Sequence, residues 1–288
     1  MKLALGTAQF GSAYGLANLG GKIPLDEAQR ILTFARRVGI DVLDTAAGYG
    51  DCEAVLGKIK TPGWKLITKI PPLDDSVVNV ESWVITQVNA SMQRLGTNNL
   101  YGVLLHRPED ILNDRGSQYL RGLKQLRDSG RVTHIGYSIY SPALLGELTS
   151  RLWPDILQTP FNVFDQRIRN SGWLDKLTSN GTIVHARSVF LQGLLLMHES
   201  DIPAYFDSWK PMLFKWLKAV AGEGVYPLEI ALNFALQEKR LDRVVVGVDS
   251  LVQLEQLVAA VKSMEIPDLT GLACDDVHLI EPFRWKIQ

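Results

Sequence analysis

The spacing of apolar residues predicts a series of amphipathic helices. Ile31, Phe34 and Val38 recur at positions i, i+3 and i+7, which places them on one face of a helix. Pro24 precedes this stripe and Gly39 follows it, and both are typical of helix boundaries. Similar stripes occur three more times along the chain. The sequence therefore predicts helices from one end to the other.

Short apolar runs, typical of buried strands, separate these stripes. We expect eight strands, at Leu3–Leu5, Val42–Asp44, Lys65–Thr68, Tyr101–Leu105, Val132–Tyr137, Ile156–Gln158, Thr182–Ala186 and Val244–Val246. Alternation of strands and helices predicts a parallel sheet, because parallel neighbours need a crossover connection.

Eight strands in a chain of this length fit a closed (β/α)8 TIM barrel, which commonly takes ~250 residues. An open doubly wound sheet is less consistent, because residues 6–11 (GTAQFG) do not match the glycine spacing of a dinucleotide-binding turn. We expect one (β/α)8 barrel domain over residues 1–288, with a long loop and helix insertion around 193–224. The aromatic residues of this insertion, Tyr205, Phe206, Trp209, Phe214 and Trp216, could line an apolar pocket or form core.

Composition narrows the class of protein. The formal net charge is −1, with 46% hydrophobic and 21% charged residues, so neither nucleic acid nor an anionic membrane is an expected partner. No apolar run approaches the ~18 residues of a membrane span, and no signal peptide is evident. Cys52 and Cys274 form neither a zinc nor a disulfide pattern. We expect a cytoplasmic protein, monomeric or weakly homo-oligomeric, without a metal.

Four ionisable residues lie at or just beyond the ends of predicted strands. Asp44 closes the second strand and Tyr49 lies in the loop after it, whereas Lys69 and His106 follow the third and fourth strands. Reactive groups of (β/α)8 barrels gather at the carboxyl-terminal face. Each residue alone has a structural explanation, such as a helix cap for the aspartate. Their shared position at one rim favours a catalytic site.

These residue types fit the reduction of a carbonyl group. A free tyrosine has a pKa of about 10 and is a poor acid at neutral pH. An ammonium group beside it favours the phenolate, so we expect Lys69 to lower the pKa of Tyr49. Asp44 would pair with Lys69, and His106 would donate a hydrogen bond to the carbonyl oxygen. Tyr49 is therefore the expected general acid.

Three motifs around these residues resemble those of the aldo-keto reductases. They are residues 44–50 (DTAAGYG), 67–69 (ITK) and 104–108 (LLHRP), and the resemblance covers nearly the whole chain. It implies a (β/α)8 barrel that reduces an aldehyde or ketone, which includes sugar-derived carbonyls, with a nicotinamide cofactor, usually NADPH. The catalytic tetrad of the family falls on Asp44, Tyr49, Lys69 and His106.

The resemblance also implies a set of cofactor-binding residues. Ser138 and Gln158 match positions that hold the nicotinamide carboxamide, although Ile139 replaces an asparagine of the family. Arg187 stands where an aromatic ring usually stacks on the nicotinamide, and its planar guanidinium can stack in the same way. In the alternative alignment, Phe190 does so. The implied set is Gly6, Thr7, Asp44, Ser138, Gln158, Arg187, Ser188, Leu191, Gly193, Gly247, Asp249 and Gln253.

The loop after the last predicted strand departs most from the family. NADPH-dependent members carry Arg or Lys here for the 2′-phosphate, whereas this chain has Asp249, and Leu257 replaces an adenine-binding asparagine. A carboxylate repels a phosphate dianion, although water and salt screen the effect. Either the enzyme prefers NADH, with Asp249 binding ribose hydroxyls, or a basic residue from another loop compensates. The resemblance keeps NADP as the expected cofactor and NAD as the alternative.

Two other functions are compatible with these residues. A Schiff-base aldolase would use Lys69 as a neutral nucleophile, which a neighbouring Asp44 opposes. A barrel that binds the cofactor with little turnover, in a redox-sensing or interaction role, would fit the departures at Ile139, Arg187 and Asp249. In each case we expect a small-molecule carbonyl partner. Because segment 267–288 is short, we expect specificity to depend on 193–224 and on the loops after the first and fourth strands.

Overall fold

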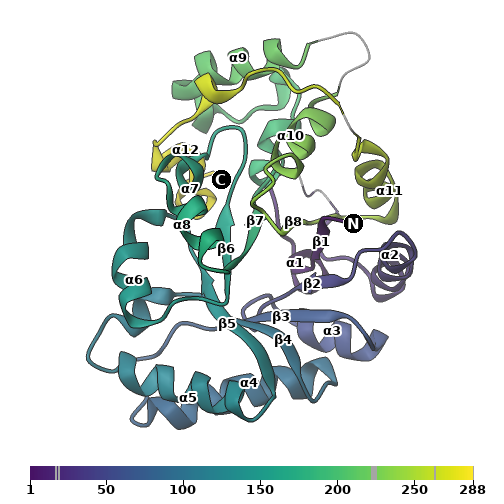
Figure 1. The fold of residues 1–288 in the computed structure, drawn as a ribbon. Coiled ribbons are helices and arrows are strands. Elements are labelled where there is room, and N and C mark those ends of the chain that lie inside the picture. The colour runs from purple at the N-terminus through teal and green to yellow at the C-terminus, as the bar shows by residue number, and fades with distance from the viewer. Residues whose placement is uncertain (17, 19, 222–225, 263, 288) are drawn as a thin grey trace.

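Eight parallel strands form a closed barrel in the computed structural model, which describes residues 1–16, 18, 20–221, 226–262 and 264–287 (Figure 1). Each strand pairs with the next, and β8 pairs with β1. The barrel confirms the predicted (β/α)8 fold class, and every predicted strand is present. The strands are β1 (Leu3–Gly6), β2 (Val42–Asp44), β3 (Lys65–Ile70), β4 (Leu100–Leu105), β5 (Val132–Ser138), β6 (Ile156–Pro160), β7 (Ile183–Arg187) and β8 (Arg243–Val246).

Helices surround the barrel (Figure 1). None of the helices within the described residues combines the length and apolar character needed to cross a bilayer. They are α1 (Ala8–Gly11), α2 (Leu25–Arg37), α3 (Cys52–Ile59), α4 (Val80–Leu95), α5 (Gly116–Asp128), α6 (Leu145–Arg151), α7 (Arg167–Asn170), α8 (Trp173–Ser179), α9 (Lys210–Ala219), α10 (Pro227–Leu236), α11 (Leu251–Ala260) and α12 (Val277–Ile280).

The boundary signals in the sequence mark real helix ends. Pro24 is the N-cap of α2, and Gly39, just beyond the helix, has a φ of 84°. The Asn79 side chain accepts a hydrogen bond from the Ser82 N–H at the start of α4, and Gly96 ends that helix with a φ of 66°. Both glycines occupy the left-handed region that they adopt at little steric cost.

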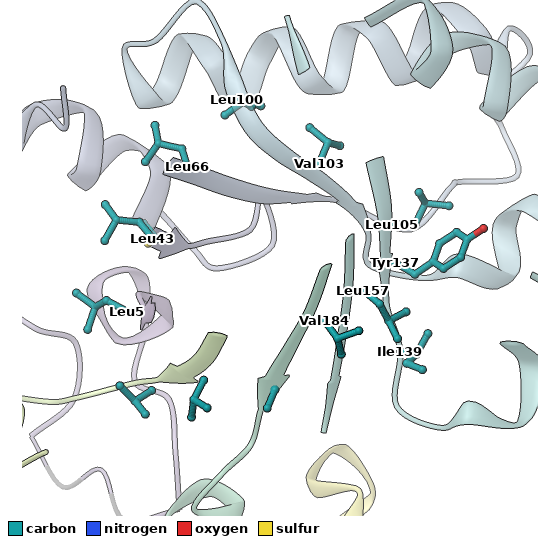
Figure 2. Close-up of a cluster of buried hydrophobic side chains, with 14 of the residues drawn as sticks. Leu5, Leu43, Leu66, Leu100, Val103, Leu105, Tyr137, Ile139, Leu157 and Val184 are labelled. Carbon is teal, nitrogen blue, oxygen red and sulfur yellow. The ribbon is translucent and has the colours of Figure 1, made fainter. Parts of the chain in front are cut away.

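Alternate residues of the strands face two separate hydrophobic layers. Leu5, Leu43, Leu66 and Val103 belong to a large cluster that also contains buried residues of the helices, and Figure 2 shows part of it. Residues one position away, namely Ala4, Val42, Ile67, Leu104, Ile156 and Val245, form a second cluster that fills the barrel interior. This two-sided burial explains why the strands read as apolar runs in the sequence.

The predicted insertion between β7 and α10 forms its own apolar cluster. It contains 3₁₀ helices at Leu191–Leu196, Glu199–Asp201 and Ala204–Trp209, followed by α9. Phe206 and Trp216 are buried there together with Leu279 and Ile280 of the C-terminal segment. The yellow C-terminal chain accordingly passes α9 and reaches α7 and α12 in Figure 1. Residues 222–224 of the predicted insertion lie outside the described residues.

Candidate active site

The carboxyl ends of the strands bring the predicted site residues to one end of the barrel. Asp44, Ser138 and Arg187 are the last residues of β2, β5 and β7, respectively. Lys69 lies next to the end of β3, and His106 directly follows β4. The parallel order of the strands therefore gathers residues that are far apart in the sequence.

A close backbone contact fixes the loop that carries Tyr49. A Cβ atom added to Gly11 of α1 would lie 1.8 Å from the Tyr49 carbonyl oxygen, and one on Gly50 would lie 2.3 Å from the Gly11 oxygen. Gly50 also has a φ of 58°. The N–H of Tyr49 donates to the Ala46 oxygen at 3.1 Å. Two glycines are thus required for α1 and the Tyr49 loop to touch.

Lys69 and Asp44 form a buried ion pair. Nζ of Lys69 donates to both carboxylate oxygens of Asp44, at 2.9 and 2.8 Å, and to the Thr45 carbonyl oxygen at 3.0 Å. The side chains are 0% and 6% exposed, respectively. A buried ammonium needs such partners, because an unpaired charge away from water is very costly. The predicted pairing of Asp44 with Lys69 is therefore present.

Further hydrogen bonds hold the Asp44 carboxylate in place. Nε2 of Gln158 donates to Oδ1 of Asp44 at 2.7 Å, and Oγ of Ser138 donates to Oε1 of Gln158 at 3.4 Å. The backbone of Asp44 is also anchored, because Oγ1 of Thr7 donates to its carbonyl oxygen at 2.9 Å. Residues from β2, β3, β5 and β6, and Thr7 directly after β1, are thereby connected in one polar network.

Tyr49 and His106 face each other beside this network. Their ring centroids are 5.8 Å apart, and the rings are nearly perpendicular at 82°. Nζ of Lys69 lies 5.0 Å from the centroid of the Tyr49 ring. The four predicted tetrad residues are therefore neighbours in space. A small polar group could contact both Tyr49 and His106, because both side chains line the same cleft.

The pKa of Tyr49 is shifted in the direction opposite to that expected from the sequence. Burial raises this pKa above its ordinary value of 10.0, and the negative charge of Asp44 raises it further. The positive charge of Arg187 opposes this rise, and the hydrogen-bond donors of Lys69 are directed at Asp44 and Thr45 rather than at the phenol. Tyr49 is therefore a protonated phenol at neutral pH and holds the proton that a reaction could use.

His106 is neutral at physiological pH. Burial lowers its pKa from 6.5 to about 4, and the positive charges of Lys69 and Arg187 act in the same direction. A neutral imidazole has one N–H donor and one acceptor nitrogen. His106 can therefore donate a single hydrogen bond into the cleft without carrying a charge.

A cleft of about 830 Å³ extends from these residues across β7, β8 and β1 to α11. This volume is within the usual range for sites of small molecules and cofactors. The cleft is lined by most of the predicted cofactor-binding residues. Leu191 packs instead in the apolar cluster of the insertion, whereas Gln158 and Lys69 are fully buried behind the cleft surface. The lining members of the predicted set are Gly6, Thr7, Asp44, Ser138, Arg187, Ser188, Gly193, Gly247, Asp249 and Gln253.

The N-terminus of α11 lies at the far end of the cleft, and groups of the chain already bind its N–H donors. The N–H of Leu251 donates to Oε1 of Glu27 at 2.6 Å, and that of Gln253 donates to Oγ of Ser250 at 3.2 Å. The N–H of Asp249 donates to Oε1 of Gln253 at 2.7 Å. The Glu27 carboxylate, which also pairs with Arg30 at 2.9 Å, therefore lies where the helix dipole attracts an anion. Asp249 lies just before the helix, and its Oδ1 accepts a hydrogen bond from Nδ2 of Asn18 at 2.9 Å.

Several residues of the cleft were not identified from the sequence. Tyr140, two residues beyond Ser138, could have been found from that position alone. Tyr14 and Asn18 come from the long loop after β1, and Lys262 follows α11. The sequence analysis expected the insertion at 193–224 to determine specificity, and the structure corrects this expectation in part. Of its described residues only Gly193 and Leu196 line the cleft, because Tyr205, Phe206, Trp209 and Trp216 pack in the apolar cluster with the C-terminal segment and Phe214 is exposed.

Arg187 and Phe190, the two alternatives for stacking on a nicotinamide, both line the cleft. The guanidinium carbon of Arg187 lies 4.2 Å from the centroid of the Tyr140 ring. Arg187 therefore already packs on an aromatic face within the protein.

No group of three or more His, Cys, Asp or Glu side chains among the described residues is arranged to hold a metal ion.

Comparisons with known proteins give one consistent family. The sequence profile of the aldo/keto reductase family matches residues 2–274. L-galactose dehydrogenase of Arabidopsis thaliana is 25% identical over 94% of this chain and 90% of its own length. L-glyceraldehyde 3-phosphate reductase of Escherichia coli O157:H7 is 24% identical over 69% of this chain and 64% of its own length.

The fold has counterparts among solved structures. The holo form of an aldo-keto reductase from Bacillus halodurans superimposes with a TM-score of 0.76, covering 99% of this chain and 95% of that one at 20% identity. Its apo form superimposes with a TM-score of 0.73. At this identity the likeness concerns the fold alone.

Proposed function

Because this chain belongs to the aldo/keto reductase family, we propose that it reduces the carbonyl group of a small aldehyde or ketone with a nicotinamide cofactor. The observation that supports this proposal best is the position of Tyr49 opposite His106, with the Lys69–Asp44 pair beside them. The arrangement offers one proton donor and one neutral hydrogen-bond donor to a single oxygen atom.

The proposed roles follow from the protonation states. His106 donates a hydrogen bond to the carbonyl oxygen and fixes its orientation. Tyr49 transfers its phenolic proton to this oxygen as negative charge develops there. The raised pKa of Tyr49 keeps the proton on the phenol beforehand. Lys69 and Asp44 act on Tyr49 through their electric field and through the position of the loop.

The cleft fits a dinucleotide that would supply the hydride. Ser138 is the side chain that would hold the carboxamide of its nicotinamide, and Gly6 and Gly247 would allow its close approach. Gln158 is fully buried and bonded to Asp44 and Ser138, so it would support Ser138 from behind rather than contact the ring. A Cβ atom on Gly247 would come within 2.6 Å of the amide end of the Gln9 side chain, so a larger residue at this position would displace Gln9. The cleft then continues to α11, where the adenosine end would lie.

NADH suits this site better than NADPH. Glu27 binds the first N–H of α11 and Asp249 lies just before this helix, so a 2′-phosphate there would meet the carboxylate of Asp249 and that of Glu27, which is paired with Arg30. Lys262 also lines this end of the cleft, but its Nζ is held by Oε1 of Glu229 at 2.5 Å. Asp249 can instead accept hydrogen bonds from ribose hydroxyls. These contacts support a proposal of NAD, the alternative cofactor of the sequence analysis.

The aldolase alternative receives no support from the position of Lys69. Its Nζ points to Asp44 and Thr45, and the side chain is 0% exposed. A Schiff base would require a neutral amine that reaches the substrate. A cofactor-binding protein with little turnover would have the same cleft, so activity must decide between that role and a reductase.

An absorbance assay at ~340 nm tests the proposal. The purified protein should oxidise NADH in the presence of simple aldehydes, and the rate with NADPH should be lower. Parallel titrations of tryptophan fluorescence give the two cofactor affinities independently of turnover. Tight NADH binding without turnover over a broad carbonyl panel would support a sensing role instead, and failure to bind either dinucleotide would overturn the proposal.

A further inference from the structure

Arg187 places a fixed cation beside Tyr49 and His106. It is the last residue of β7 and lines the cleft together with both of them. One of its terminal nitrogens donates to the Ile139 carbonyl oxygen at 2.9 Å and the other to Oγ of Ser188 at 3.1 Å. A guanidinium has five N–H donors, so three of them have no partner among the described residues.

The carboxylates near Arg187 are already paired with other cations. Asp165 accepts two hydrogen bonds from Arg167, at 2.9 and 2.8 Å. Asp44 is bound by Lys69. Within the described residues, Arg187 itself forms no ion pair. The guanidinium therefore contributes an uncompensated positive charge to the catalytic end of the cleft.

This charge acts on the catalytic residues. Arg187 lowers the pKa of His106 and opposes the rise in the pKa of Tyr49 caused by burial. Both effects require the guanidinium to be near the two side chains and incompletely screened by water. A ligand group that contacts Tyr49 and His106 is accordingly within the field of Arg187.

The guanidinium is also preorganised. It lies on the Tyr140 ring, whose centroid is 4.2 Å from the guanidinium carbon. Tyr140 is held in turn by Phe283, with ring centroids 4.4 Å apart, and its carbonyl oxygen accepts a hydrogen bond from Arg167 at 2.8 Å. A stacked guanidinium of this kind loses little entropy when it binds a carboxylate or phosphate.

We propose that the natural substrate carries an anionic group, a carboxylate or a phosphate, and that Arg187 binds this group while Tyr49 and His106 hold the carbonyl. The inference rests on the proposed reductase function and adds the substrate class. In the reaction, a hydride from the dinucleotide adds to the carbonyl carbon and the phenolic proton of Tyr49 goes to the oxygen. The dinucleotide is oxidised, the substrate becomes a hydroxy acid or a phosphorylated alcohol, and the anionic group is unchanged.

This role differs from stacking on the nicotinamide. In the structure one face of the guanidinium is covered by Tyr140, whereas three N–H donors at its edge have no partner among the described residues. Edge donors bind anions by charge-assisted hydrogen bonds, often two at once. The unengaged part of Arg187 thus has the chemistry of an anion site.

Matched substrate pairs test the inference. We compare 4-carboxybenzaldehyde with its methyl ester, and glyceraldehyde 3-phosphate with glyceraldehyde. The wild-type protein should favour the charged member of at least one pair by about tenfold in kcat/KM, the ratio expected from one charge-assisted hydrogen bond. The pair with the larger ratio distinguishes a carboxylate from a phosphate.

Variants assign the preference to Arg187. In Arg187→Gln the charged-to-neutral ratio should fall to about one, and Arg187→Lys should retain part of it. A ratio within one variant cancels any common loss of activity or folded protein. Arg121→Gln serves as the matched control, because Arg121 pairs with Glu81 on the outer helices and its side chain is 58% exposed. That variant should keep the wild-type ratio.

The outcomes separate this inference from the proposed function. If both members of each pair are reduced with equal kcat/KM, the proposed anion site is wrong and the proposed reductase function still holds. The same holds if Arg187→Gln weakens NADH binding and keeps the ratio, which would assign Arg187 to the cofactor. Absence of turnover with every substrate, including the neutral ones, overturns the reductase and the anion site together.

Discussion

The Nζ atom of Lys69 lies 2.8 Å from Oδ2 of Asp44, and both side chains are almost completely removed from solvent. Such a pair contributes little net stability when intact, because desolvation offsets the Coulomb attraction. Its geometry nevertheless positions the loop and the field around Tyr49. Removal of one partner should therefore be far more harmful than replacement of both.

We expect Asp44→Asn and Lys69→Met each to lower the free energy of unfolding by ~3–5 kcal/mol, because each leaves an uncompensated buried charge. The double variant should cost clearly less than the sum of the two. Urea denaturation of the wild type, the two single variants and the double variant at pH 7 gives the coupling free energy of the pair. Strict additivity would show that the pair is not coupled.

Replacement of Tyr49 by Phe should lower kcat by about 10²–10⁴-fold, because the hydroxyl group that supplies the proton is removed and the aromatic ring remains. The affinity for NADH should change little. Steady-state rates and tryptophan fluorescence give the two quantities separately. A Tyr49→Phe variant with nearly wild-type turnover would assign the proton to another group.

The lowered pKa of His106 predicts a pH-dependent stability. The unfolded state takes up a proton near pH 6.5, whereas the folded state does so only near pH 4. The free energy of unfolding should therefore fall as the pH drops from about 6.5 toward 4, by about 2 kcal/mol between pH 7 and pH 5. Above pH 7 this contribution should be constant.

Denaturation of the wild type and of His106→Gln at pH 7 and pH 5 isolates this contribution, because the other titrating groups are common to both. The variant should lose about 2 kcal/mol less on acidification. The pH profile of kcat/KM should also show no inflection near 6.5. An inflection there that disappears in His106→Gln would contradict a neutral histidine.

The two carboxylates at α11 predict how cofactor preference can be changed. Asp249→Lys should improve the affinity for NADPH relative to NADH by about tenfold, because an ammonium replaces a carboxylate beside the 2′-phosphate position. Asp249→Asn, which removes the charge alone, should give a smaller change. Fluorescence titrations measure both ratios.

Glu27→Gln provides an independent check, since it neutralises the other carboxylate and leaves Asp249 unchanged. It should also favour NADPH. Unchanged ratios in all three variants would mean that the adenosine end binds elsewhere in the cleft.

The sequence was sufficient to predict the barrel and to pick out four residues, at or just beyond strand ends, that the structure places together. Strands that are buried on both faces appear in the sequence as runs of apolar residues. A polar residue at or after the end of a run marks the end of the strand. Asp44, Lys69 and His106 could be placed for that reason. Tyr49 could be identified because it lies in the loop that follows Asp44. The resemblance to a family supplied the expected roles of the four residues.

Other features depend on contacts that a sequence does not display. The contact between Glu27 and the Leu251 N–H joins residues separated by 224 positions. The direction of the Tyr49 pKa shift required knowledge of its burial and of the three acceptors around Lys69. The packing of Arg187 on the Tyr140 ring likewise depends on the barrel, which brings the ends of β5 and β7 together.

The wall of the cleft at Tyr140 is shared by two distant segments. Arg167 bonds to the Tyr140 carbonyl oxygen and to Oε1 of Glu281, and Phe283 packs on the Tyr140 ring. A chimera that imports only the loop after β5 from another barrel would separate these partners. Transfer of substrate preference between such proteins therefore requires that the loop and residues 281–284 be exchanged as one unit.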